Sequence, residues 1–140
     1  MHIKRDGGWN YMGTPITRPA MVKLFSTILR CDDGKYYLVT PVEKVGIRVD
    51  DAPFVVVEMD YAKDKITFHT NVDDEVTVSK VNPIRVVVDE VTGEPSPYVR
   101  VRDNLDALIC RSVFYQLVEH SIEQNGRHGV VSCGEFFPLD

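Results

Sequence analysis

Two distant stretches of the chain carry the same order of residue types, and this repeat constrains the fold more than any other feature. The first is Thr17–Thr40 and the second is Cys110–Ser132. Each begins with an arginine at an expected helix start, Arg18 or Arg111, and continues with an apolar stripe at helical spacing. An Asx-Gly-basic turn and an apolar strand follow in both. We therefore predict two repeated helix-turn-strand motifs.

The apolar spacing predicts a helix over about Arg18–Arg30 and a second over Ser112–Gln124, each ended by its Asx-Gly pair. Thr17 suits the N-cap position of the first helix, and Pro19 suits its first turn. Leu24 belongs to the stripe that this helix is expected to bury.

Between the repeats the sequence predicts strands. Short runs of apolar and β-branched residues follow one another from Val42 to Asp89, broken by turn residues and without a helical period. The opening His2–Met12 predicts a hairpin around Asp6-Gly7-Gly8. The expected fold is α+β: mostly antiparallel strands with two helices, built from the two repeated motifs around a central β stretch.

One segment, Thr92–Pro97, is rich in Pro, Gly and Ser and is the expected boundary between lobes. Residues 1–92 would form an N-terminal lobe with the first repeat and the central β stretch. Residues 93–140 would form a C-terminal lobe with the second repeat, and the two lobes would pack as one compact unit. A chain of 140 residues with 44% hydrophobic content is long enough to bury such a core.

Charge and cysteine content bound the class of protein. A formal net charge of −5 argues against nucleic-acid binding, which needs a basic face. No apolar run approaches the roughly 18 residues of a membrane span. The odd number of cysteines and the absence of a CxxC pair predict free thiols, no metal and a cytoplasmic location. The three cysteines are Cys31, Cys110 and Cys133.

Four segments together resemble a known bacterial family. They are Gly7–Phe25, Thr40–Phe54, Phe68–Val76 and Gly93–Leu117, and they include the distinctive TPVEKV and DAPF stretches. Together they resemble the family of domains of unknown function numbered 1285. The resemblance implies a small α+β protein built from repeated structural motifs, with a part in signalling. It supplies no catalytic residues and no cofactor.

The strongest candidate site is the pair Arg18 and Arg111, because helix N-termini already favour anions and a guanidinium adds a bidentate donor. The alternative is that each arginine pairs with a carboxylate of the protein and only fixes a loop. Glu43, Lys44 and Asp51 are the next candidates, with an ordinary surface ion pair or a turn as their alternatives. We expect Arg18 and Arg111 to point toward a groove between the repeats, with Glu43, Lys44 or Asp51 within reach of one of them.

No catalytic or metal-binding motif accompanies these residues, since GxSxG, HExxH and HxxEH are all absent. The sequence therefore favours a non-enzymatic cytoplasmic module that binds a small anionic ligand or a protein partner. The alternative is a small hydrolase or isomerase that uses a carboxylate and an arginine in a groove between the lobes.

Overall fold

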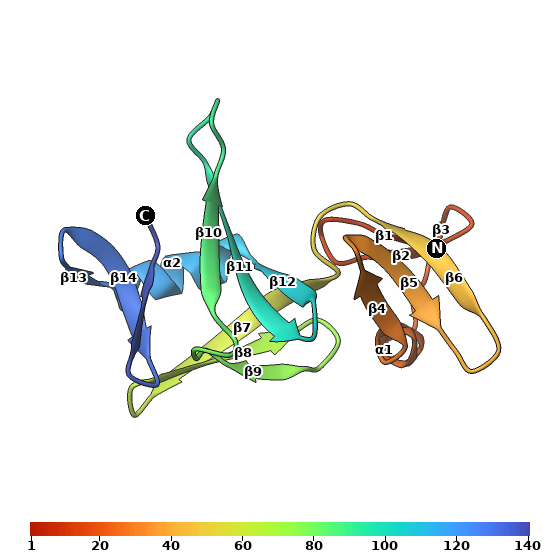
Figure 1. The fold of residues 1–140 in the computed structure, drawn as a ribbon, viewed down its shortest axis with the longest axis horizontal. Helices are drawn as coiled ribbons and strands as arrows, with labels where there is room; N and C mark the ends of the chain where they lie inside the picture. Colours follow the sequence, from red (N-terminus) through yellow and green to blue (C-terminus); the bar gives the residue numbers. More distant parts are fainter.

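The computed structural model describes residues 1–140, and most of the chain forms strands (Figure 1). Two α-helices and fifteen strands are present, and the strands are arranged in three sheets. The helices are α1 (Pro19–Ser26) and α2 (Arg111–Glu119). The predicted mixed α+β class with mostly antiparallel pairing is confirmed. Neither helix has the length and hydropathy of a membrane span.

The N-terminal lobe is a six-stranded sheet in the order β3-β2-β1-β6-β5-β4. Its strands are β1 (His2–Ile3), β2 (Trp9–Tyr11), β3 (Thr14–Pro15), β4 (Leu29–Asp32), β5 (Lys35–Val39) and β6 (Lys44–Val49). Two antiparallel meanders, β1-β2-β3 and β4-β5-β6, join through β1 and β6, which pair in parallel. The predicted hairpin around Asp6–Gly8 connects β1 to β2.

The second sheet has the same topology with longer strands, in the order β10-β11-β12-β7-β8-β9. Its strands are β7 (Phe54–Ala62), β8 (Lys65–Thr70), β9 (Glu75–Thr77), β10 (Ile84–Val88), β11 (Pro95–Arg102) and β12 (Leu105–Ile109). Again two meanders join through the first and last strands, and β7 and β12 form the parallel pair.

After β12 the chain forms α2 and a three-stranded sheet that completes the C-terminal lobe. The strands of this sheet are β13 (Ile122–Gln124), β14 (Arg127–Ser132) and β15 (Glu135–Pro138). The buried Ser132 hydroxyl ties the small sheet to the large one, because it accepts a hydrogen bond from the Ile66 amide at 3.0 Å and donates one to the Val78 carbonyl at 2.7 Å.

One hydrophobic core runs through both lobes. Ile3, Trp9 and Leu29 of the N-terminal lobe belong to the same buried cluster as Phe54 and Leu117 of the C-terminal lobe. Trp9 is only 2% exposed and stacks on Phe25, with 6.3 Å between the ring centroids. The lobes therefore share their core instead of folding around two separate ones.

Both helices are shorter than predicted. α1 ends at Ser26, where the Ser26 and Thr27 hydroxyls donate to carbonyls of the preceding turn, each at 2.6 Å. Leu29–Asp32 then forms β4 and pairs with β5 across the Asp33-Gly34 turn. In the same way, β13 lies between α2 and the Asn125-Gly126 turn. The Asx-Gly pairs therefore turn hairpins and do not end helices, and their positive φ angles suit that role.

Two further expectations differ from the structure. Leu24 is 60% exposed, because the short α1 turns its partly buried Val22 and Phe25 toward the core instead. The segment Thr92–Pro97 lies at the β10–β11 hairpin, within one sheet, where Val88 pairs with Pro95. The division between the lobes falls instead at residues 50–53, where the chain leaves β6 and enters β7.

Candidate functional site

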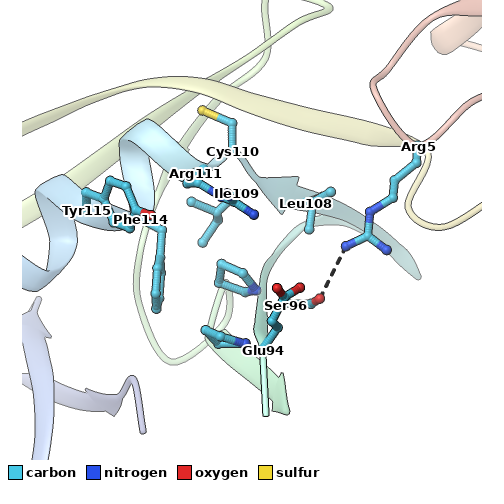
Figure 2. Close-up of a pocket in the computed structure, with 11 residues that line it drawn as sticks. Arg5, Glu94, Ser96, Leu108, Ile109, Cys110, Arg111, Phe114 and Tyr115 are labelled. Atoms are coloured by element: carbon cyan, nitrogen blue, oxygen red, sulfur yellow. Dashed lines mark hydrogen bonds between the residues drawn. The ribbon is translucent and has the colours of Figure 1, made fainter. Parts of the chain in front are cut away.

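A pocket of about 410 Å³ lies where the two lobes meet, and we call it the Arg111 pocket (Figure 2). Four segments line it: the turn after β1, the start of β11, the end of β12 and the first turn of α2. Its charged residues are Arg5, Glu94 and Arg111, and its main apolar residues are Pro95, Pro97, Leu108, Ile109 and Phe114. The pocket therefore combines a few charges with an apolar wall, as small-molecule sites do.

Arg111 is placed by the junction of β12 and α2. Ile109 is buried at the end of β12, and the Cys110 amide donates to the Val56 carbonyl at 3.2 Å. The helix then starts at Arg111 and is anchored by the fully buried Val113. No side chain caps this helix start, so the first-turn amides have no side-chain partner at the end where Arg111 stands. Both features favour an anion at this end of the pocket.

Arg5 is the contribution of the N-terminal lobe. Its guanidinium donates to the Ser96 hydroxyl at 3.2 Å and lies 3.5 Å from the Asp51 carboxylate. Asp51 in turn accepts a hydrogen bond from the Tyr98 hydroxyl at 2.8 Å. Burial raises the pKa of Tyr98, and the Asp51 carboxylate raises it further. Arg5 thus connects Asp51, in the segment between the lobes, with Ser96 of β11 on the wall of the pocket.

Comparison with known proteins identifies the family. Residues 1–52 match the model of the N-terminal domain of unknown function DUF1285, and residues 53–139 match the model of the DUF1285 C-terminal domain. The chain belongs to the DUF1285 family. The division between the two family domains coincides with the division between the lobes, at residues 50–53.

Two solved structures of DUF1285 proteins are similar to this chain. One, from Silicibacter pomeroyi DSS-3, is 54% identical with a TM-score of 0.95, over 99% of this chain and 78% of its own. The other, from Shewanella baltica OS155, is 29% identical with a TM-score of 0.68, over 84% of this chain and 89% of its own. No curated protein matches. The resemblance seen in the sequence is therefore confirmed at the level of family and fold.

In this DUF1285 protein the predicted site residues divide into two groups. Arg111 lines the pocket, and Asp51 does not line it but contacts the pocket residue Arg5. Arg18 precedes α1, is exposed and makes no ion pair, and it does not line the Arg111 pocket. Glu43 is exposed in the turn before β6. Hence Arg18 and Arg111 do not face one groove.

Lys44, the last predicted residue, belongs to a separate surface cluster. Its ammonium group lies 2.8 Å from the Asp32 carboxylate and 4.3 Å from the centroid of the Tyr37 ring. The hydrogen bond between Lys44 and Asp32 lowers the pKa of Asp32 and raises that of Lys44. This is a surface ion pair, the alternative that the sequence left open for Lys44, and it reaches from β6 across β5 to β4.

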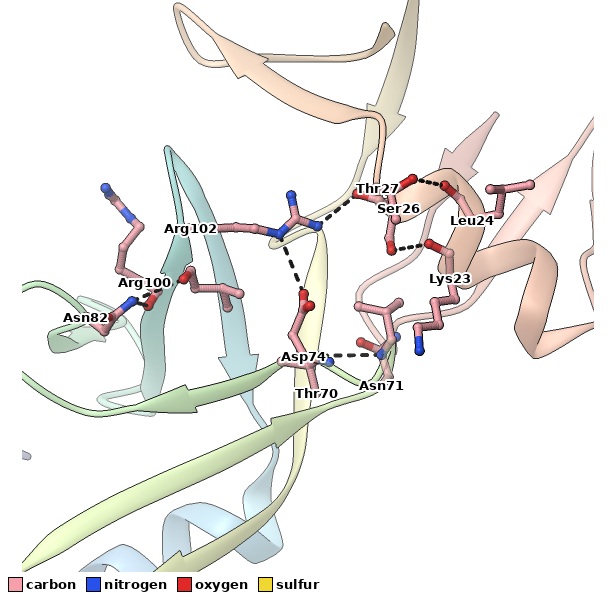
Figure 3. Close-up of polar contacts among 12 residues, drawn as sticks. Lys23, Leu24, Ser26, Thr27, Thr70, Asn71, Asp74, Asn82, Arg100 and Arg102 are labelled. Atoms are coloured by element: carbon pink, nitrogen blue, oxygen red, sulfur yellow. Dashed lines mark hydrogen bonds and ion pairs between the residues drawn. The ribbon is translucent and has the colours of Figure 1, made fainter. Parts of the chain in front are cut away.

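A second set of polar contacts, apart from the pocket residues, holds the lobes together (Figure 3). Arg102 donates to the Ser26 carbonyl at the end of α1, at 2.9 Å, and lies 3.7 Å from the Asp74 carboxylate. The Asn71 amide donates to the Gly7 carbonyl at 3.2 Å and accepts from the Val55 amide at 3.0 Å.

The sequence did not indicate Arg5, Glu94 or Phe114 as site residues. Arg5 sits in the β1–β2 turn and Glu94 in the β10–β11 hairpin, both of which have the composition of ordinary surface turns. Phe114 belongs to the apolar stripe that the helical spacing predicts for the second helix, yet it is only half-buried and lines the pocket. The packing of the lobes brings Arg5 to the pocket, and the pairing of β11 with β12 brings Glu94 there, whereas Phe114 follows Arg111 in α2.

Proposed function

We propose that this protein binds a small anionic ligand in the Arg111 pocket, with Arg111 as the main partner of the anion. The observation that supports this most is that Arg111, at an uncapped helix start, lines a pocket with an apolar wall. A bidentate guanidinium and free backbone amides suit a carboxylate or a phosphate. Arg5 supplies a second positive charge across the pocket.

The position of the pocket supports a sensing role, in keeping with the part in signalling that the family resemblance implies. Arg5 comes from the N-terminal lobe, whereas Arg111 and Glu94 come from the C-terminal lobe. A ligand in the pocket would lie against residues of both lobes, and a partner that contacts this surface could then distinguish the bound protein from the free one. We place the protein in the cytoplasm, because its three cysteines are unpaired.

Binding is favoured over the alternative of a hydrolase or isomerase. General acid–base chemistry needs a carboxyl group whose pKa is raised toward neutrality beside the substrate. The carboxyl groups with a displaced pKa are all shifted downward and lie outside the pocket. They are Asp32, Asp50, Asp89 and Asp140.

We also infer that the two helix-containing segments are a repeat, since α1-β4-β5 and α2-β13-β14 have the same element order and the same Asx-Gly turn. Arg18 then stands in the first unit where Arg111 stands in the second. Because Arg18 does not line the pocket, Arg18→Gln is a matched control for Arg111→Gln.

Thermal denaturation with and without simple anions tests the proposal. Millimolar phosphate, benzoate or 3-phenylpropionate is expected to raise the melting temperature of the wild-type protein, because a ligand that binds only the folded state stabilises it. Arg111→Gln should abolish this shift and Arg18→Gln should retain it. An equal loss in both variants would contradict the site. If no anion shifts the wild-type protein, the protein-partner hypothesis replaces ligand binding.

A further inference from the structure

Arg111 stands apart from most arginines of the protein because no carboxylate neutralises it. Six of the nine arginines lie within 4 Å of an aspartate oxygen, and these are Arg5, Arg48, Arg85, Arg100, Arg102 and Arg127. Arg18, Arg30 and Arg111 form no such pair. Of these three, Arg111 lines the pocket. Its charge is therefore available to a ligand.

Glu94 also lacks a partner of opposite charge, but it carries a negative charge. It lines the pocket from the base of the β10–β11 hairpin, and its carboxylate has no ion pair or hydrogen bond in the protein. Its backbone is fixed, because its carbonyl accepts from the Asp89 amide at 3.0 Å and its amide donates to the Thr92 hydroxyl at 3.2 Å. Figure 2 shows the carboxylate beside Ser96, directed toward the pocket.

Arg111 and Glu94 share the pocket without pairing with each other. Arg5, the third charge, is already engaged by Asp51 and Ser96. The pocket thus holds one unneutralised cation and one unneutralised anion, with the side chains of Leu108 and Phe114 on its wall. A doubly charged anion such as phosphate would approach Glu94 at an electrostatic cost. A molecule that carries both charges would satisfy both residues.

We infer that the Arg111 pocket takes a zwitterion, namely a small amino acid-like molecule whose carboxylate meets Arg111, whose ammonium group meets Glu94 and whose apolar part rests on Phe114. This inference rests on the proposed function, because it names the ligand class of the same pocket. It assigns Glu94 as the residue that discriminates an amino acid from the corresponding simple acid.

Matched compounds that differ by one charged group test the inference by isothermal titration calorimetry at low ionic strength. The probes are phenylalanine and leucine, their counterparts without the amine, 3-phenylpropionate and 4-methylpentanoate, and the amine 2-phenylethylamine. The wild-type protein should bind each amino acid at least about tenfold more tightly than its simple acid, which is the effect of one charge-assisted hydrogen bond. The amine should bind more weakly than either.

The variants separate this inference from the proposed function. Glu94→Gln should remove the preference for the amino acid and leave binding of the simple acid equal or tighter, whereas Arg111→Gln should weaken both. The melting temperature of the Glu94→Gln variant without ligand should stay near that of the wild-type protein, because the Glu94 side chain is exposed and has no partner within the protein. Two results would refute the inference of a zwitterionic ligand and leave the proposal of anion binding intact. One is that the simple acids bind as tightly as the amino acids, and the other is that Glu94→Gln leaves the ratio of the two affinities unchanged. If neither acids nor amino acids bind, both proposals fail.

Discussion

Arg102 makes three contacts that together require an arginine, and the one to Ser26 joins the C-terminal lobe to the N-terminal lobe. One nitrogen donates to the Ser26 carbonyl, which lies at the end of α1 where helix carbonyls lack partners. A second faces Asp74, and the guanidinium lies 5.2 Å from the centroid of the Phe54 ring. The sequence could not reveal these contacts, because each partner is distant in the chain and Arg102 reads as one more charged residue of an alternating strand.

Arg102→Met should lower the free energy of unfolding by about 1–3 kcal/mol, since it leaves the Ser26 carbonyl and the partly buried Asp74 carboxylate unpaired while keeping much of the side-chain volume. Urea denaturation measures the change. Arg30→Met is the control, because Arg30 is exposed and forms no ion pair, and it should change the free energy by less than about 0.5 kcal/mol. Equal effects of the two substitutions would show that the Arg102 contacts add nothing.

At the scale of elements, turns were predictable and helix ends were not. Asp33-Gly34 and Asn125-Gly126 are turns as expected, because their chemistry is local. The helix lengths depend on pairing with another element. Leu29 continues the helical spacing of α1 in the sequence, yet it is 3% exposed in β4, opposite Leu38 of β5. Strand pairing across a tight turn therefore overrides the last helical turns, and periodicity alone does not detect such competition.

Gly129 in β14 is expected to tolerate no side chain. A Cβ atom there would overlap the Phe137 carbonyl and would lie 2.7 Å from the Phe136 ring, both on the neighbouring strand β15. Gly129→Ala should therefore lower the free energy of unfolding by about 3 kcal/mol or more, measured by urea denaturation. Gly126→Ala is the comparison, because its φ of +81° is strained but nothing lies nearby, and about 1 kcal/mol is expected. The reverse order would refute the steric argument.

At the scale of the whole molecule, the family models and the sheets divide the chain at one place, whereas buried residues from both lobes belong to one hydrophobic cluster. Residues 50–53 separate the sheets, but Ile3 and Trp9 pack in the same cluster as Phe54. Composition placed the boundary at Thr92–Pro97 because a hairpin turn and a linker use the same residues. Likewise, the sequence indicated Arg111 but not Arg5 as a candidate residue, and both line the pocket, since no local pattern records which turn lies against which helix.

The shared core predicts that the lobes unfold together. Trp9 is the single tryptophan and lies in the N-terminal lobe, so its fluorescence reports on that lobe. Far-UV circular dichroism reports on the whole chain. The two signals should follow one urea transition with the same midpoint. An earlier fluorescence transition would show instead that the N-terminal lobe opens on its own.

The parallel pair in the middle of each six-stranded sheet also governs how the chain folds as it is synthesised. His2 pairs with Arg48, and Phe54 pairs with Ala107. The first strand of each sheet can therefore complete its pairing only after the last strand has been synthesised. Such distant pairing is slow to form. Until β12 leaves the ribosome, one side of β7, with its run of valines at Val55–Val57, stays an open edge. A nascent chain that stops before residue 105 should therefore bind chaperones at β7, and completion of β12 should release it.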